Sequence, residues 1–327
     1  MPTVPPGPLF RLLGPPDLRT PEQTVAIGPK QALVLAGLLL RAGEVVAAGT
    51  LADYVWGTDL PANPASRLRT LVAELRRTIA PVAPGAIVTR APGYLIDVAP
   101  GACDVHAFHT ALTAARGAPE PQTALTHYDE ALALWHGPAL DGLYSQAAQA
   151  DAARLDELHA CAQEESAEVM LTLGRHRTLL PELAALTATR PDRERPHAQL
   201  MLALFRCGRT EDALRAYRAL RTRLAAESGL EPSPEVQRLH KDILSADPGL
   251  ALTRPSEPPK CSQLPPGTGV FTGREEQLRA LGPIGCGLVA LTGPAGIGKT
   301  ALAVTWAHRI AADFPDGRLF INLRGFD

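Results

Sequence analysis

The run from Gly293 to Thr300 has a spacing of residue types that could bind phosphate. Its pattern is GxxxxGK followed by Thr. Gly293, Gly296 and Gly298 allow backbone N–H groups to wrap an anion, Lys299 can reach the β- and γ-phosphate oxygens, and the Thr300 hydroxyl can ligate Mg²⁺. These residues predict a nucleotide site for ATP or ADP with Mg²⁺.

Such a site needs a sheet behind it and a helix in front. The sequence predicts a buried strand at Leu288–Thr292, a helix at Ala301–Ala312 and a further strand at Arg318–Leu323. No acid after Lys299 is in a position to hold Mg²⁺ or activate water, so we expect an incomplete P-loop α/β segment without hydrolysis. The chain is expected to need no cofactor and not to be an enzyme, with nucleotide use belonging to a longer form.

A second chemical feature is a locally basic stretch. Between residues 67 and 90 there are five arginines and a single acid, Glu74. The net charge of the whole chain is only −2, so a nucleic-acid binder must concentrate its positive charge in such a place. A solvated helix face would also be rich in arginine, and the elements around the stretch decide between the two interpretations.

Those elements follow a recognisable order. Helices are expected at Lys30–Ala42, Leu51–Trp56 and Ala65–Ala80, the third capped by Asn63 and Pro64, and a hairpin with a tight Pro-Gly turn at Ile87–Ile96. Before them, Pro8–Leu13 and Val25–Ile27 are expected to be short strands around a turn at Pro15–Asp17. Three helices followed by a hairpin is the winged helix-turn-helix plan, in which the third helix reads base edges in the major groove.

The third helix has a buried and an exposed side. Its buried stripe is expected to contain Leu68, either Leu71 or Val72, Leu75 and Ile79. The other faces carry the arginines. An arginine-rich helix in this position, with the TRAPGY hairpin after it, indicates DNA binding over mere solvation.

At these residues the sequence resembles a known family. GPKQALVLAGLLLRAGEVV, LADYVWG, LRTLVAELRRTI and TRAPGYLIDV are similar to the OmpR-type winged helix of the Streptomyces antibiotic regulatory protein (SARP) family. The resemblance implies a leading β-sheet, binding to tandem direct repeats of double-stranded DNA near promoter −35 elements, and recruitment of RNA polymerase holoenzyme through its sigma factor and other subunits. It also assigns roles to side chains. Bases would be faced by Arg69, Thr70 and Glu74, phosphates would be held by Arg67, Arg76, Arg77 and Thr89, and the minor groove would be reached by Arg90.

The middle of the chain is helical throughout. Helices are expected at 104–116, 121–135, 146–173, 176–189, 195–206, 210–226 and 233–245. Gly174-Arg-His and Gly208-Arg-Thr recur 34 residues apart, and with Ala213 and Tyr217 they match tetratricopeptide-like helix hairpins. The run also resembles the bacterial transcriptional activation domain (BTAD) of SARP proteins, which implies self-association as a dimer on DNA. His106 and His109 have no further metal-ligand partners in the sequence.

After the helices the composition changes. Residues 247–269 are dense in Pro, Gly and Ser and are interpreted as a linker. Val270-Phe-Thr-Gly-Arg-Glu-Glu-Gln-Leu then resembles the entry motif of NB-ARC-type ATPase domains, which large, AfsR-like members of the family carry. The expected domains are therefore 1–100 (winged helix), 101–246 (BTAD, tetratricopeptide-like), 247–269 (linker) and 270–327 (start of an NB-ARC-type domain), a mainly α, multidomain chain.

Bulk properties narrow the function further. The five cysteines are scattered, with neither a CxxC pair nor paired His spacing, which indicates a reducing cytosol without a zinc site or disulfide framework. No apolar run is long enough to span a membrane, so we expect a cytoplasmic protein with no membrane partner. Three functions stay open: a DNA-binding activator of an antibiotic or other secondary-metabolite gene cluster, a P-loop NTPase whose nucleotide state regulates DNA binding, and a protein-binding scaffold. The arginines of the third helix and the wing favour the first.

Overall fold

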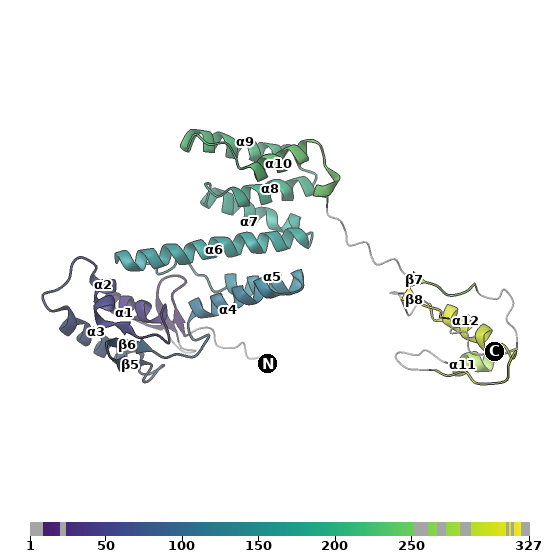
Figure 1. Ribbon diagram of the computed structural model, residues 1–327, viewed down its shortest axis with the longest axis horizontal. Coiled ribbons are helices and arrows are strands. Elements are labelled where there is room, and N and C mark those ends of the chain that lie inside the picture. Colours follow the sequence, from purple (N-terminus) through teal and green to yellow (C-terminus); the bar gives the residue numbers. More distant parts are fainter. Residues whose placement is uncertain are drawn as a thin grey trace. The chain divides into compact units, whose positions relative to one another are not determined.

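A computed structural model describes residues 9–19, 24–251, 261–266, 273–281, 289–311, 314 and 317–321. The chain divides into two units, Met1–Leu252 and Thr253–Asp327, each described below by itself. The first unit is mainly helical, as predicted (Figure 1). Among the described residues, no helix is long and apolar enough to cross a membrane, and no group of three or more His, Cys, Asp or Glu side chains could hold a metal ion.

The first unit begins with two small sheets and three helices. Strands β1 (Phe10–Arg11), β2 (Asp17–Arg19) and β3 (Thr24–Val25) form an antiparallel sheet in that order. The next elements are α1 (Pro29–Leu39), β4 (Val46–Ala47), α2 (Ala48–Trp56), α3 (Pro64–Ile79), β5 (Ile87–Arg90) and β6 (Gly93–Ile96). Strands β4, β6 and β5 form the second sheet, in that order. The leading sheet, the three helices and the hairpin are thus confirmed.

Two details of this region differ from the sequence-based prediction. The expected turn at Pro15–Asp17 ends earlier, because Asp17 already begins β2, a strand that was not predicted, and pairs with Arg11. Strand β4 was not predicted at all. It is only two residues long and exists because Val46 and Ala47 pair with Tyr94 and Gly93 of the hairpin. Gly93 is required at this point, since a Cβ there would overlap the backbone oxygen of Val46.

Seven helices follow, close to their predicted bounds. They are α4 (Asp104–Gly117), α5 (Pro121–Leu132), α6 (Gln146–Thr172), α7 (His176–Thr189), α8 (Glu194–Arg206), α9 (Thr210–Glu227) and α10 (Pro234–Leu244). The predicted repeat is visible in their connections. Gly174 and Gly208 both have a left-handed backbone, with φ of 75° and 76°. In each case the following arginine donates its N–H to the carbonyl five residues earlier, so both helices end in the same way.

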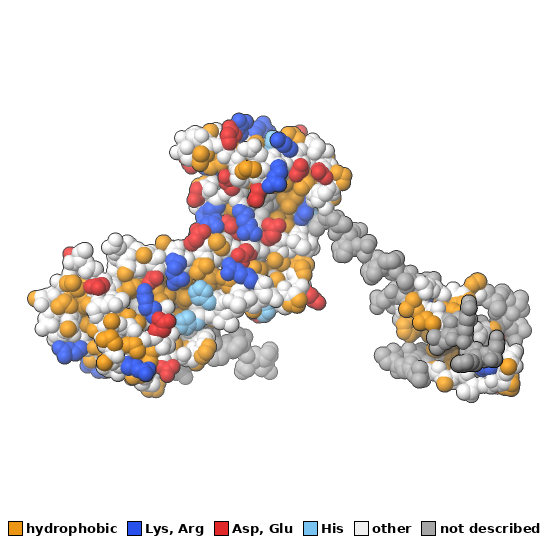
Figure 2. Space-filling view, viewed as in Figure 1, with side chains coloured by type: hydrophobic (Ala, Val, Ile, Leu, Met, Phe, Trp, Pro, Cys, Tyr) orange, Lys and Arg blue, Asp and Glu red, His pale blue; other side chains and the backbone are white. Residues whose placement is uncertain are grey.

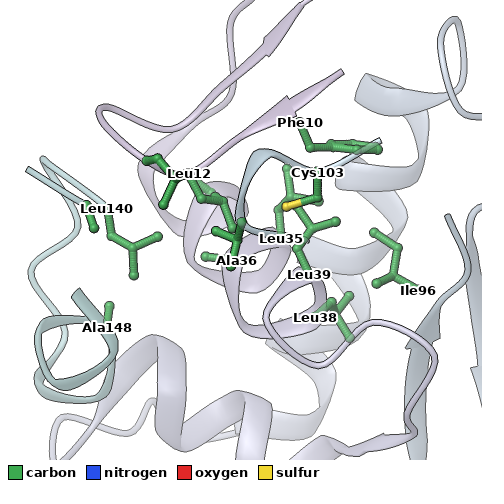
Figure 3. Close-up of a cluster of buried hydrophobic side chains, with 14 of the residues drawn as sticks. Phe10, Leu12, Leu35, Ala36, Leu38, Leu39, Ile96, Cys103, Leu140 and Ala148 are labelled. Carbon is green, nitrogen blue, oxygen red and sulfur yellow. The ribbon is translucent and has the colours of Figure 1, made fainter. Parts of the chain in front are cut away.

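One hydrophobic core joins the two halves of the first unit. Figure 3 shows part of it: Phe10 of β1, Leu12 just after that strand, Leu35 and Leu39 of α1, and Ala148 of α6. The same core includes residues of α4 and α5. The expected boundary at residue 100 therefore lies within a continuous core. Helices α7 to α10 pack around two separate, smaller clusters, one of which includes Tyr217 stacked on His240 with ring centroids 3.8 Å apart.

Two polar contacts reinforce this junction. The buried Asp104 carboxylate, at the start of α4, accepts hydrogen bonds from the N–H groups of Leu12, Leu13 and Val105 at 2.8–2.9 Å. The Tyr54 hydroxyl of α2 donates to Asp151 of α6 at 3.0 Å. Burial and the adjacent Asp151 carboxylate raise the pKa of Tyr54, so the hydroxyl remains a donor. The winged helix is thus fixed to α4 and α6.

The second unit has few described elements. They are β7 (Cys261–Ser262), α11 (Glu275–Ala280), α12 (Lys299–Arg309) and β8 (Gly317–Arg318), with β7 and β8 paired in parallel. The predicted linker at 247–269 is not wholly irregular, because it includes β7 and a 3-10 helix, η1 (Pro248–Leu250). The expected helix at 301–312 begins two residues earlier, at Lys299, and the strand expected at 318–323 is short, its last two positions lying outside the described residues.

Candidate nucleic-acid interface

Helix α3 presents a polar side because its large apolar residues lie on the other. The Asn63 side chain caps the helix by accepting from the Ser66 N–H at 3.1 Å, with Pro64 in the first turn. The buried stripe consists of Leu68, Val72, Leu75 and Ile79. Between the two candidates for this stripe, Val72 is buried and Leu71 is only half-buried.

The predicted site residues of α3 fall into three pairs. Members of each pair are seven positions, or about two turns, apart and therefore lie along one side of the helix. The pairs are Arg67 with Glu74, Arg69 with Arg76, and Thr70 with Arg77. The first two pairs flank the buried stripe on opposite sides, and Thr70 with Arg77 lies farthest from the core. The helix therefore presents three distinct polar lines to a partner.

Arg76 connects α3 to the hairpin. Its Nε donates to the Ile87 carbonyl at 3.0 Å, and its Nη2 donates to the Thr89 hydroxyl at 2.8 Å. Two residues predicted to hold phosphates, Arg76 and Thr89, are thus in contact with each other. This contact fixes the hairpin beside α3, a positioning role that the sequence did not reveal.

The opposite side of α3 borders a groove of about 290 Å³. Arg67, Thr70 and Glu74 line it together with Lys30 at the start of α1 and Trp56 at the end of α2. The Lys30 ammonium lies 5.9 Å from the Trp56 ring centroid. Sequence reasoning missed Lys30 as a site residue. Its position beside Pro29, in the first turn of a helix, could have indicated an exposed cation there.

Polar contacts also limit what two of the predicted base-facing residues can do. Glu74 accepts a long hydrogen bond, 3.4 Å, from Gln31 Nε2, and the Thr70 hydroxyl donates to the Ser66 carbonyl at 3.2 Å.

By contrast, four arginine side chains are exposed and have neither a hydrogen bond nor an ion pair with any described residue. They are Arg67, Arg69, Arg77 and Arg90. These four guanidinium groups are free to bind phosphates or base edges.

Other arginines of the first unit are distributed differently. On the face shown in Figure 2, Lys and Arg side chains over α6 to α10 alternate with Asp and Glu. Several cations of these helices form ion pairs, such as Arg215 with Asp212 at 3.1 Å and Arg221 with Glu231 at 2.8 Å. Ion pairs are thus common on these helices, although single arginines such as Arg177 of α7 are also unpaired among the described residues. The feature of α3 and the hairpin is that four unpaired, exposed arginines belong to one helix and the strand beside it.

Substitutions of Arg76 and of Arg77 are expected to weaken DNA binding for different reasons. Arg77→Ala removes one free charge, so it should weaken binding to all sequences and reduce the salt dependence of log K by about one unit. Arg76→Lys keeps the charge but loses the guanidinium contacts to Ile87 and Thr89, so it should weaken binding by roughly three- to tenfold with little change of salt slope. Fluorescence anisotropy at several salt concentrations measures both effects. Equal salt slopes for the two variants would contradict the positioning role of Arg76.

The glycine-rich loop of the second unit folds back on its own backbone. Gly296 and Gly298 have left-handed φ values of 75° and 87°, and Gly298 is the N-cap of α12. The half-buried Lys299 donates through Nζ to the carbonyls of Gly293 and Pro294, both at 2.9 Å, while Thr300 is exposed. Arg274, from the predicted entry motif, donates to the Ile297 carbonyl at 2.6 Å. The helix after the loop is confirmed.

The strand predicted before the loop is wrong for the residues that the structure describes. Residues 289–292 adopt no strand, and Val289 is 41% exposed. A phosphate loop binds nucleotide tightly when a buried strand fixes its first residues, and residues 289–292 do not form one. Nucleotide binding by Gly293, Gly296, Gly298, Lys299 and Thr300 stays a prediction.

We expect nucleotide to have little effect on DNA binding by this chain. Lys299→Ala removes the cation that would reach the phosphates, so DNA affinity with ATP, ADP or neither should change less than twofold between this variant and the unaltered chain. Anisotropy titrations with Mg²⁺ present measure it. A nucleotide effect that is present in the unaltered chain and lost in Lys299→Ala would show that the loop is a working switch.

The described geometry defines a class of protein. A three-helix core, an exposed basic third helix and a hairpin fixed beside it constitute a winged helix-turn-helix DNA-binding domain, here sharing its core with a helical domain.

Comparisons with known proteins agree with this class. Residues 22–96 match the family "Transcriptional regulatory protein, C terminal", and residues 103–244 match "Bacterial transcriptional activator domain". The chain is 40% identical to the regulatory protein DnrI of Streptomyces peucetius, covering 73% of this chain and 91% of that one. It is 38% identical to the regulatory protein AfsR of Streptomyces coelicolor, covering 97% of this chain but only 34% of AfsR.

A solved structure is also similar. Mycobacterium tuberculosis EmbR, in complex with a low-affinity phosphopeptide, superposes with a TM-score of 0.69 at 31% identity, covering 73% of this chain and 65% of EmbR. The chain belongs to the Streptomyces antibiotic regulatory protein family, with an OmpR-type winged helix followed by a bacterial transcriptional activator domain. It is therefore a DNA-binding transcriptional regulator, and it spans about a third of the length of AfsR.

Proposed function

We propose that this chain is a transcriptional activator that binds tandem direct repeats near promoter −35 elements and recruits RNA polymerase holoenzyme. The observation that carries the proposal is the set of unpaired, exposed arginines on the wing and on α3, outside the buried stripe of that helix. Its target is an antibiotic or other secondary-metabolite gene cluster, as the membership of its family suggests. RNA polymerase contacts include the sigma factor and other subunits.

The direct repeats are taken from the family, and the way the winged helix is held determines what they require of the dimer. Each chain has one recognition helix, and that helix is fixed to α4 and α6 through the shared core and through Tyr54 and Asp151. Two copies that associate side by side in the same orientation would place their α3 helices in the same orientation on DNA. The proposed complex is therefore a dimer on double-stranded DNA with one repeat for each chain.

A second function has one observation in its favour. The loop from Gly293 to Thr300 keeps the glycine conformations and the helix N-terminus of a nucleotide site. A regulatory ATPase of the NB-ARC type in a longer form would use this loop with Mg²⁺ at Thr300. For this chain we propose a regulator and not an enzyme, because both matched families are domains of transcriptional regulators.

Footprinting tests the proposal. We expect protection of two direct repeats whose centres are about one helical turn apart, since one winged helix occupies each repeat. The DNA to use is the set of promoter regions near the gene for this protein. Deleting either repeat should reduce affinity, whereas inverting one should abolish cooperative binding. Protection of an inverted palindrome with no tandem copy would contradict the arrangement, and no specific protection at all would contradict the function.

A further inference from the structure

A cavity of about 500 Å³ lies between α6, α8 and α10, away from the winged helix. Its size falls within the range of small-molecule sites in proteins. Neither the proposed DNA-binding function nor the shared core uses the residues that line it.

Apolar side chains from all three helices form one part of the lining. Leu171 of α6 and Val236 of α10 are nearly fully buried, with 1% and 2% of their surface exposed. Leu202 of α8 and Leu239 of α10 are half-buried and present the rest of the apolar surface. A ligand with an apolar group would bury it here.

The charged part of the lining is mainly negative. Glu168, Glu194 and Glu235 contribute three carboxylates, against one cation, Arg195. Arg195 already lies 3.9 Å from the buried Glu164 carboxylate, so its charge is partly balanced. Among the described residues these acids do not form a metal site. Their charge therefore favours an organic cation over an anion or a metal ion.

A buried side-chain amide in the lining lacks a hydrogen-bond donor for its oxygen within the described part of the chain. Gln199 lines the cavity and is only 3% exposed. Its Nε2 donates to the Glu164 carbonyl at 2.8 Å and to Glu168 Oε2 at 3.2 Å. Because both partners can only accept, the orientation of the amide is fixed. Gln199 Oε1 is then buried with no hydrogen-bond partner among the described residues, and a buried acceptor of this kind is normally paired with a donor.

We propose that this cavity binds a ligand that carries a protonated amine or guanidinium group on an apolar stem. The stem packs on Leu202 and Leu239, the positive charge lies among the carboxylates, and an N–H of the ligand donates to Gln199 Oε1. The same chemistry is offered by a small organic cation and by an arginine side chain of a peptide. This inference is independent of the proposed promoter function.

Calorimetric titration of the full chain with n-pentylguanidinium tests the site, with n-pentanol as the uncharged probe of equal stem length. We expect pentylguanidinium to bind at least tenfold more tightly than pentanol. Glu235→Gln, a change at an exposed position, should weaken pentylguanidinium binding by about threefold or more, whereas Glu182→Gln on α7 should leave it unchanged. Similar affinities for the two probes, or no binding of pentylguanidinium, would overturn the proposal.

Gln199→Met tests the amide separately. Loss of its carbonyl should reduce pentylguanidinium affinity about tenfold, with pentanol binding unchanged. If this variant melts at a lower temperature, the Glu235→Gln comparison still decides the matter. Unchanged affinity in a folded Gln199→Met protein would contradict the role of the amide.

A third arm identifies the source of the ligand. A capped tripeptide with arginine between two leucines is titrated in the same way. Tighter binding than pentylguanidinium supports a protein segment as the ligand, and weaker binding supports a small molecule, while both support the chemistry of the site.

Discussion

Replacing Arg69 by alanine is expected to weaken binding to the preferred DNA site by about 1–3 kcal/mol, roughly 5- to 150-fold, and to weaken binding to random DNA much less. The physical reason is that Arg69 is exposed, has no partner in the described structure, and can donate two parallel hydrogen bonds to a base edge. The same change should relax the sequence preference at one position of each repeat. Competition titrations with single-base variants of the repeat measure both effects.

Arg177→Ala is a matched control for Arg69. Arg177 lies on α7, is exposed, and has no ion pair with a described residue, so the change removes the same charge far from α3. We expect this control to alter specific affinity less than twofold. Equal loss of specific and non-specific affinity in Arg69→Ala would instead assign Arg69 to phosphate contact, in the same role as Arg77.

Replacing Asp104 by alanine is expected to lower the free energy of unfolding of the first unit by about 3–5 kcal/mol. The Asp104 carboxylate is 1% exposed and accepts from three backbone N–H groups, and the N–H groups of Leu12 and Leu13 would be left buried without a partner. Burial raises the pKa of this carboxyl, and the hydrogen bonds from those N–H groups oppose the shift. Urea unfolding followed by circular dichroism measures the change.

Two further variants make the Asp104 result interpretable. Asp104→Asn keeps one acceptor oxygen, so its loss should be smaller and measurable even if the alanine variant does not fold. Asp129→Ala, at an exposed position of α5 without a described partner, should change stability by less than about 0.5 kcal/mol. A loss below about 1 kcal/mol in Asp104→Ala would show that the leading sheet is held by its apolar side chains alone.

The helices could be predicted closely because their signals are local. Asn63 and Pro64 set the start of α3, and the left-handed glycines at 174 and 208 mark where α6 and α8 end. Strand β4 could not be predicted, because two residues become a strand only through pairing with Tyr94 and Gly93, more than forty positions away. The strand expected before Gly293 was wrong because its composition indicated burial, whereas Val289 is 41% exposed and residues 289–292 form no strand.

The candidate interface was predictable in its elements and not in its contacts. Sequence placed the arginines on one helix and one hairpin, which the structure confirms. That Arg76 binds Thr89, and that Gln31 reaches Glu74, depends on how α1, α3 and the hairpin pack, which no local pattern encodes. Which side chains read bases stays a prediction that the Arg69 and Arg77 variants test.

The continuous core has a practical consequence for engineering. A chimera that takes the first 100 residues as a portable DNA-binding module would lose the hydrogen bond between Leu12 and Asp104. It would also expose the apolar faces of α1 and α4. A module that extended through α6 and ended at Gly174 would still expose Ala167 and Leu171, which α6 buries against α7 and α8. New promoter specificity is therefore better introduced by substitutions on α3 than by exchange of whole domains.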